Sequence, residues 1–233
     1  MIGVIGDIHG QFHLLDIVIG ALKAYPLDAV LLVGDIGIEP NVFGPDGHAD
    51  SVEQAVNMAK VLGPVFWVPG NHDSPSALRR IDGNIDGRGV EIKGLRIIGV
   101  GGSPDSFGWS YERSEEALSR ALRLAGKGDI VLSHCPPKGT PIGRAKNGDD
   151  CGSLAVRDYA EEQHEGLLVC GHIHEAAGAV QLGQSLCMNV GALGRPYGKA
   201  QFGLIGRSPE GVDWAEHHDI SGSTPVIQRW ERK

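Results

Sequence analysis

The sequence predicts an α/β fold in which two mixed sheets face each other between outer layers of helices. Up to residue 163, short apolar runs alternate with helical patterns, which is typical of strand–helix–strand units and of a parallel or mixed sheet. Beyond residue 163, short strands and turns dominate the chain. Two facing sheets flanked by helices accommodate both parts of this pattern.

Each predicted strand is a short apolar run between turn residues, as expected for strands buried on both faces. The predicted strands are residues 2–6, 29–33, 64–68, 90–93, 95–100, 130–133, 166–170, 179–182, 185–190, 201–205 and 212–216. The predicted helices are residues 12–25, 51–62, 114–125 and 153–163. Ser51 and Ser114 are placed to cap two of these helices. Residues 36–50 are rich in Gly, Pro and Asp and are expected to form a loop.

The chain is expected to form one domain. Its 233 residues are enough for one large domain with a substantial core. There is no internal repeat, linker or low-complexity block that would divide it. We therefore expect a single domain over residues 1–218, followed by a C-terminal tail over residues 219–233.

Composition and charge narrow the class of function. The net charge of −8 argues against binding of long nucleic acids, which requires a basic surface. The four cysteines form no CxxC pair, which favours reduced thiols and a cytoplasmic location. The N-terminal apolar run has no basic start, and no apolar segment approaches 18 residues. We expect neither a signal peptide nor contact with a membrane.

Polar residues of metal-binding type gather where the apolar runs stop. Singly, each could be a turn former or a helix cap. Together they follow five predicted strands, and in α/β sheets sites form outside the carboxyl ends of strands. The residues are Asp7, His9, Asp35, Asn71, His72, His134, His172 and His174. We expect them to form one site, and Gly171 to lie where a side chain would crowd it.

The donor set predicts two divalent metal ions. Four histidines with three or four carboxylate and amide oxygens exceed what one four-coordinate zinc needs. They are enough for two ions that share a bridging carboxylate. Since no cysteine belongs to the set, the mixed oxygen and nitrogen donors favour Mn²⁺, with Fe, Zn²⁺, Ni²⁺ or Co²⁺ as alternatives. Two such ions can activate a water and stabilise an in-line phosphoryl displacement.

Five short blocks in this order resemble those of the calcineurin-like metallophosphoesterases, in particular a branch of small phosphodiesterase-like members. The blocks are GDIHG (6–10), GD (34–35), GNHD (70–73), SH (133–134) and GHIH (171–174). They span about three quarters of the chain. The resemblance implies a four-layer α/β/β/α sandwich of two mixed sheets flanked by helices, with a two-metal hydrolytic site.

The resemblance also implies a role for each residue of the site. The first metal ion would be held by Asp7, His9 and His174, the second by Asn71, His134 and His172, and Asp35 would bridge them. The nucleophile would be a hydroxide activated by the two metals. Asn71 and His72 would contact the substrate, with His72 over the leaving oxygen as phosphate binder or general acid.

The second block departs from one well-known pattern of this superfamily. In phosphoprotein phosphatases it continues as GDxxDRG, whereas residues 34–39 read GDIGIE here. The Asp that partners the catalytic His and the Arg that grips phosphate are both absent. This argues against a phosphoserine/threonine phosphatase and leaves the orienting partner of His72 open. Asp73 is adjacent to His72, but it need not point back toward it.

The predicted function is that of a metal-dependent phosphoesterase. Phosphodiesters of nucleotides or related small molecules are the favoured substrates. A phosphomonoesterase acting on a small phosphorylated metabolite is the alternative. A non-catalytic scaffold on the same fold is disfavoured, because such a protein is expected to have lost ligand positions that are all present here. The oligomeric state is left open.

Several other residues have competing interpretations. Arg144, Lys146 and Arg195 could attract a phosphate, although solvated loop positions are favoured. Phe107, Trp109 and Tyr111 could form a wall that stacks a base or aryl group, or a packing cluster over the sheets. Asn189 could support the metal shell, although a turn role is favoured. The remaining histidines are expected not to bind metal; they are His13, His48, His164, His217 and His218.

Overall fold

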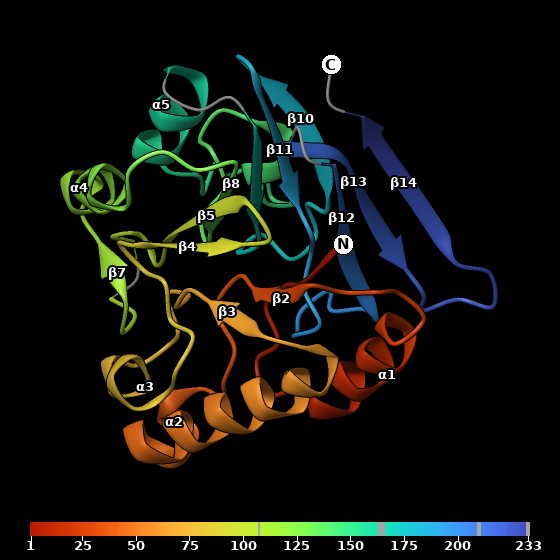
Figure 1. The fold of residues 1–233 in the computed structure, drawn as a ribbon. Helices are drawn as coiled ribbons and strands as arrows, with labels where there is room; N and C mark the ends of the chain where they lie inside the picture. Colours follow the sequence, from red (N-terminus) through yellow and green to blue (C-terminus); the bar gives the residue numbers. More distant parts are fainter. Residues whose placement is uncertain (107, 163–165, 209–210, 232–233) are drawn as a thin grey trace.

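Two six-stranded sheets form the centre of the molecule in the computed structural model, which describes residues 1–106, 108–162, 166–208 and 211–231 (Figure 1). The first sheet has the order β14-β13-β12-β1-β2-β3 and the second β10-β11-β9-β8-β5-β4. Each sheet joins a group of parallel strands to antiparallel neighbours, so both sheets are mixed, as predicted.

The strands of the first sheet come from the two ends of the chain. They are β1 (Ile2–Ile5), β2 (Ala29–Leu32), β3 (Val65–Trp67), β12 (Gln201–Ser208), β13 (Gly211–Asp219) and β14 (Val226–Glu231). Strands β1, β2 and β3 are parallel, so their carboxyl ends lie at the same edge of the sheet. That edge receives three of the five blocks singled out in the sequence.

The strands of the second sheet come from the middle of the chain. They are β4 (Gly89–Ile92), β5 (Leu95–Val100), β8 (Ile130–Ser133), β9 (Leu167–Cys170), β10 (Gly178–Leu182) and β11 (Ser185–Asn189). Strands β5, β8, β9 and β11 are parallel. A separate two-stranded ladder joins β6 (Ser103–Pro104) to β7 (Glu112–Arg113).

Helices cover the outer face of each sheet (Figure 1). The first sheet carries α1 (Phe12–Leu22), α2 (Pro40–Ala59) and α3 (Pro75–Arg80), and the second carries α4 (Glu115–Ala125) and α5 (Leu154–Glu162). Short 3₁₀ turns are η1 (Lys60–Leu62) and η2 (Pro141–Gly143). Ser114 caps α4 as predicted, since its hydroxyl accepts the Ala117 N–H. The predicted four-layer α/β/β/α sandwich is confirmed.

Three apolar clusters hold the four layers together. Along β2, Val30 and Leu32 face the helices, while Ala29 and Leu31 face the other sheet. This alternation places apolar side chains on both faces of a strand, because successive side chains point to opposite sides. The third cluster lies between the second sheet and helices α4 and α5, around Leu118. The continuous apolar runs of the sequence follow from this double burial.

The predicted loop over residues 36–50 is wrong from Pro40 onward, because helix α2 already begins there. Pro40 occupies the first turn, where its missing N–H costs nothing. Gly44, at φ 73°, interrupts the helix before Pro45. Ser51 therefore lies inside α2 and is no cap. Its hydroxyl accepts the Ile38 N–H at 2.8 Å and so fastens the loop before the helix.

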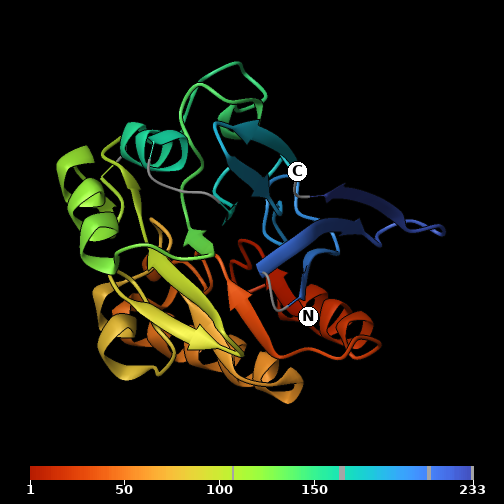
Figure 2. The ribbon, with the colours of Figure 1, turned by 45° about the horizontal axis from the view of Figure 1, so that its top comes forward.

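Part of the predicted C-terminal tail belongs to the first sheet. Strand β14 pairs antiparallel with β13 from Trp214↔Glu231 to Asp219↔Val226. Figure 2 shows this hairpin extending away from the body of the molecule. The division into a domain over 1–218 and a tail over 219–233 stays a prediction. None of the described helices is both long and apolar enough to cross a membrane.

Candidate metal centre and pocket

The two sheets bring all eight predicted site residues to one place. Asp7 and His9 follow β1, Asp35 follows β2, and Asn71 and His72 follow β3. From the second sheet, His134 follows β8, and His172 and His174 follow β9. The carboxyl ends of parallel strands in both sheets therefore meet at this site, as expected from the sequence.

The first group of donors consists of Asp7, His9, Asp35 and His174. One donor atom of each lies within 4.8 Å of the others. The Nε2 atoms of His9 and His174 are 3.2 Å apart. Nε2 of His9 is also 3.5 Å from Oδ2 of Asp35. Four donors thus converge on a space of the size of one ion.

The second group of donors lies on the other side of Asp35. Nε2 of His134 is 2.8 Å from Oδ1 of Asn71 and 3.6 Å from Oδ2 of Asp35. The rings of His134 and His172 lie edge to face, with centroids 5.0 Å apart. Since Oδ2 of Asp35 also lies 3.5 Å from Nε2 of His9, this carboxylate lies between the two groups.

The hydrogen bonds of the rings fit metal binding through Nε2. Nδ1 of His134 lies 2.8 Å from the Val33 carbonyl, and Nδ1 of His174 lies 3.1 Å from the Pro196 carbonyl. A carbonyl accepts only, so each Nδ1 carries the hydrogen and Nε2 is left with its lone pair toward the site. Ligand histidines are commonly held in this way by a second partner. The residues present therefore fit divalent metal ions.

Three of the site residues adopt the left-handed backbone region. They are His9, Asp35 and His172, with φ of 45°, 47° and 67°. Few non-glycine residues do so, because the side chain crowds the following carbonyl. Such strain is typical of functional sites, where the surroundings over-determine the backbone. Here the His172 N–H donates to both oxygens of Asp7 at 3.0 Å, which fixes the turn.

Glycines let the loops approach the carboxylates closely. A Cβ on Gly171 would overlap Oδ2 of Asp7, and one on Gly70 would overlap Oδ1 of Asp35. The expectation that a side chain at position 171 would crowd the site agrees with this packing. The crowded partner is the carboxylate of Asp7.

The surroundings shift the pKa values of two histidines, one from each group, in opposite directions. Burial, reinforced by the neighbouring His134, lowers the pKa of His172 to about 3. Burial also disfavours the charged form of His9, but its hydrogen bond to Glu39 and the nearby Asp35 raise its pKa to about 9. Burial raises the pKa of Asp7. Asp35 is equally buried, but His134 and His9 hold its pKa below the usual range.

Glu39 is a site residue that the sequence did not identify. Its Oε2 accepts from Nδ1 of His72 at 2.7 Å, and its Oε1 accepts from Nδ1 of His9 at 3.1 Å. Against the cost of burial, the hydrogen bonds from His72 and His9 lower its pKa to about 2. The sequence does contain a feature that could have pointed to Glu39. It is an acidic residue shortly after the second block, one position later than the second Asp of the GDxxDRG pattern.

Asp73 has a structural role instead. It is fully buried and accepts the N–H groups of Ile36 at 3.1 Å and Gly70 at 2.8 Å. His48, as expected, is no member of the donor groups: its Nε2 lies 3.2 Å from Oδ1 of Asp73, and its Nδ1 contacts the Ile38 carbonyl. These bonds fix the loop that carries both Asp35 and Glu39.

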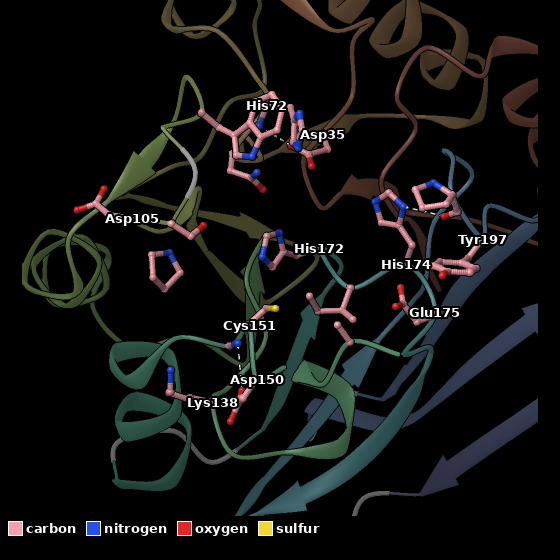
Figure 3. A pocket seen from close by; sticks show the side chains of 18 residues that line it. Asp35, His72, Asp105, Lys138, Asp150, Cys151, His172, His174, Glu175 and Tyr197 are labelled. Atoms are coloured by element: carbon pink, nitrogen blue, oxygen red, sulfur yellow. Dashed lines mark hydrogen bonds between the residues drawn. The ribbon is translucent and has the colours of Figure 1, made fainter. Parts of the chain in front are cut away.

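A pocket of about 480 Å³ opens beside the donor groups (Figure 3). Asp35 and His72 lie on one side of it and Lys138 on the opposite side, with His172 between them (Figure 3). Trp109 lines the pocket, and its ring lies 4.1 Å from that of His72, centroid to centroid. The backbone N–H of Tyr111 donates to the Asn71 carbonyl at 2.9 Å, which ties this segment to the site.

Of the aromatic residues considered as a stacking wall or a packing cluster, Trp109 and Tyr111 have different positions. Trp109 belongs to a wall of the pocket, whereas Tyr111 turns away and donates its hydroxyl to Asp86 at 2.6 Å. Phe107 lies outside the described residues. Tyr197, from the other side, also lines the pocket, and it is 47% exposed.

The three basic residues considered from the sequence are not among the residues lining this pocket. Arg144 donates to the Gly148 carbonyl, and Nζ of Lys146 lies 5.3 Å from the centre of the Tyr197 ring. Arg195 is exposed. Among the described residues that line this pocket, Lys138 is the only Lys or Arg. The sequence alone did not single it out.

The other predicted non-ligands lie apart from the donor groups where they are described. His217 contacts Gln201, His218 stacks on Phe202, and His13 is exposed. His164 lies outside the described part of the chain. Asn189 makes contacts of both kinds considered from the sequence. Its side chain accepts the Gly191 N–H at 2.8 Å in a turn, and it donates to the Ile173 carbonyl at 3.0 Å, between the two site histidines.

Comparison with known proteins places the chain in a family. The model of the calcineurin-like phosphoesterases matches residues 1–176, so the protein belongs to the calcineurin-like phosphoesterase family, whose members are metal-dependent hydrolases. The search of curated proteins gave no match.

Solved structures share the fold at low sequence identity. The TT1561 protein of Thermus thermophilus is 15% identical over 100% of this chain and 98% of its own, with a TM-score of 0.64. A dimetal phosphatase from Danio rerio is 16% identical over 100% and 96%, with a TM-score of 0.59. The phosphoesterase YfcE of E. coli is 15% identical over 100% and 99%, with a TM-score of 0.53.

Proposed function

We propose that the protein is a binuclear metal-dependent phosphodiesterase that acts on small, nucleotide-like substrates. The observation that carries this proposal is the pair of donor groups that share Asp35. Asp7, His9 and His174 would hold one ion, and Asn71, His134 and His172 the other. A fold neighbour described as a dimetal phosphatase gives further support.

The bound ions would lower the pKa of a water and neutralise charge on the phosphoryl oxygens. Mn²⁺ is favoured, because carboxylate, amide and imidazole donors without thiolate suit it. The protein's own part is to orient the donors. Burial keeps His172 neutral, and the carbonyls of Val33 and Pro196 hold His134 and His174 with Nε2 toward the ions.

His72 would contact the leaving group. It lines the pocket, and its Nδ1 is engaged by Glu39, so its Nε2 is free to face a substrate. Burial disfavours the charged ring, but the hydrogen bond to Glu39 and the nearby Asp35 raise the pKa of His72 above its usual value. A protonated His72 can bind the phosphate or give its proton to the leaving oxygen. Asn71, whose Oδ1 faces His134, would contact the substrate beside it.

The pocket favours a diester over a monoester. A monoester places one substituent on phosphorus, whereas a diester needs space for two. The cavity of about 480 Å³ extends from Asp35 and His72 toward Lys138, which is within the size range of small-molecule sites. The partly exposed Trp109 and Tyr197 offer faces for a base or aryl group.

The net charge supports a small substrate, and the free cysteines support a location inside the cell. The net charge of −8 opposes binding of a long polyanion. The four cysteines are free, which suits a reducing, cytoplasmic environment. A phosphomonoesterase on the same site is the second candidate. The scaffold hypothesis is disfavoured because the donor positions and His72 are all present and brought together.

A comparison of two esters tests the proposal. The protein is purified without chelator, its metals are counted by mass spectrometry, and turnover of bis(p-nitrophenyl) phosphate and p-nitrophenyl phosphate is measured with added Mn²⁺. We expect about two transition-metal ions per chain and faster turnover of the diester. Faster turnover of the monoester would favour the second candidate. Turnover of neither ester with several metals would argue against an enzyme.

A further inference from the structure

We propose that Glu39 is a shared positioning residue, whose single carboxylate orients both the metal-facing ring of His9 and the pocket-facing ring of His72. The assignment rests on the proposed function only where turnover is concerned. Oε1 lies 3.1 Å from Nδ1 of His9, and Oε2 lies 2.7 Å from Nδ1 of His72. One side chain thus serves the donor group and the leaving-group contact together.

The two bonds have the same chemical consequence for both rings. An ionised carboxylate only accepts, so Nδ1 of each ring must carry the hydrogen. Nε2 of His9 is then free to face His174 and Asp35, at 3.2 Å and 3.5 Å. Nε2 of His72 is free in the same way to face the pocket. A carboxylate behind a ligand histidine both fixes the ring and raises its basicity.

The backbone of Glu39 is held firmly enough for this role. The N–H of Ile38 donates to Ser51 Oγ at 2.8 Å, and the Ile38 carbonyl contacts His48. Directly after Glu39, Pro40 begins helix α2. Glu39 therefore lies between a residue held by hydrogen bonds, Ile38, and the first residue of a helix, Pro40. Its side chain is 29% exposed, which leaves it next to the pocket rather than in the core.

The rings themselves also meet. His9 and His72 lie edge to face with centroids 5.2 Å apart, and Trp109 covers His72 at 4.1 Å. His72 therefore has Glu39, His9 and Trp109 around it. With its ring restrained on these sides, the hydrogen bond to Glu39 decides which nitrogen faces the substrate.

A third ion on His9, Glu39 and His72 is the rival explanation, since donor atoms of these residues also lie within 4.8 Å of one another. It would require His9 to use Nδ1 for this ion while Nε2 faces the first donor group. The ring would then have to lose both of its hydrogens, whereas neutral imidazole offers one lone pair. The shared carboxylate needs no such step.

Zinc binding and histidine NMR test the assignment without turnover. The variants are Glu39→Gln, Glu39→Asp and, as a matched control, Glu53→Gln, an exposed carboxylate further along α2. Gln offers one acceptor oxygen, so it can satisfy only one ring. Asp keeps the charge but is one methylene shorter. Circular dichroism checks that each variant folds.

In long-range ¹H–¹⁵N spectra of the Zn²⁺-loaded wild type, we expect Nδ1–H signals for both His9 and His72. In Glu39→Gln, at least one of the two changes its tautomer or loses its protected hydrogen. Calorimetric titration should show that the Zn²⁺ affinity of the group Asp7, His9 and His174 falls about tenfold or more, the range typical of lost partners behind metal ligands. Glu39→Asp should fall between, and Glu53→Gln should match the wild type.

Turnover gives a separate readout at the His72 end. With saturating Mn²⁺, Glu39→Gln should slow diphenyl phosphate more than bis(p-nitrophenyl) phosphate, because phenol is the poorer leaving group and needs His72 more. Absence of the Nδ1–H from either ring in the wild type overturns the assignment. Spectra and Zn²⁺ affinity of Glu39→Gln that match those of Glu53→Gln overturn it as well. A wild type that turns over neither ester contradicts the proposed function instead, and leaves the two binding readouts decisive.

Discussion

The donor groups on the two sides of Asp35 each contain two histidines, with Asp7 beside them in the first and Asn71 in the second, but they lie in different surroundings. In the second group His134 is fully buried, and burial holds the pKa of His172 at about 3. In the first group His9 is 11% exposed and bonded to Glu39, and its pKa is raised to about 9. The hydrogen bond from His9 to the Glu39 carboxylate is the largest of the interactions that raise the pKa of His9.

The difference has a consequence for metal loading. A histidine binds a metal ion in its neutral form, so a protonated ring must first give up a proton. His172 is already neutral at physiological pH, whereas His9 holds a proton that an incoming ion must displace. We therefore expect the second group to bind its ion at lower pH than the first.

The largest effect is expected at the shared residue. Asp35→Ala removes a donor from both groups, so both ions should be lost or weakened together. Turnover of the diester should fall by about 10³-fold or more, equivalent to roughly 4 kcal/mol in the activation barrier. Metal counting by mass spectrometry checks the cause. Asp16→Ala, at an exposed carboxylate on α1, serves as control, and retention of two ions in Asp35→Ala would contradict a bridging role.

Removing one histidine from each group should separate them. His134→Ala and His174→Ala should each leave about one ion per chain and lower turnover by about 10²-fold or more. His134→Ala should also reduce the free energy of unfolding by roughly 1–3 kcal/mol, because it leaves the buried Val33 carbonyl without its donor. Urea unfolding of both variants measures this, and equal destabilisation would show that the groups do not differ in burial as described.

The raised pKa of His9 predicts a pH-dependent stability of the metal-free protein. The folded chain holds this proton up to about pH 9, whereas the usual value is 6.5. The stabilising contribution is complete below pH 6.5 and is lost as pH rises through 9. It amounts to roughly 3 kcal/mol. The raised pKa of His72 acts in the same direction.

Urea unfolding in the presence of a chelator, from pH 6.5 to 9, measures this loss. Glu39→Gln should flatten the profile, because the hydrogen bond to Glu39 is a main cause of the raised pKa of His9. A stability of the wild type that rises over this range would contradict the contrast between the two groups.

A smaller effect is expected from crowding the first group alone. Gly171→Ala places a methyl group against Asp7, which should cost about 1–3 kcal/mol in stability and weaken metal binding. Gly20→Ala in helix α1 is the matched control. Its Cβ meets nothing within 4 Å, so it should stabilise the helix by about 0.5–1 kcal/mol. Thermal unfolding compares the two, and a Gly171→Ala variant as stable as Gly20→Ala would contradict the close packing described.

The fold and the convergence of the candidate donor residues could be predicted, because both depend on short local patterns in the chain. Double burial makes β1, β2 and β9 continuous apolar runs, and the residues at their carboxyl ends must share an edge of a sheet. Helix α2 was predicted too short, since Gly44 and Pro45 resemble loop residues although each permits a new helical segment.

The side-chain geometry around the site could not be predicted in the same way. Glu39 and Asp73 are both acidic neighbours of site residues, and the sequence does not say which of them reaches His72. The answer depends on the loop before Glu39, where the N–H groups of Ile36 and Gly37 donate to Asp73. Asp73 is therefore engaged by the backbone, and Glu39 accepts from the histidines. Likewise, Trp109 and Tyr111 differ by two positions but face the pocket and Asp86, respectively.

Two ions that share Asp35 would lie close together, one in each donor group. Anomalous diffraction from crystals of the full chain soaked in Mn²⁺ locates them. We expect two anomalous peaks roughly 3.5–4 Å apart, one beside Asp7, His9 and His174 and one beside Asn71, His134 and His172. A single peak in this region, or peaks on His9, Glu39 and His72 in place of Asp35, would contradict this expectation.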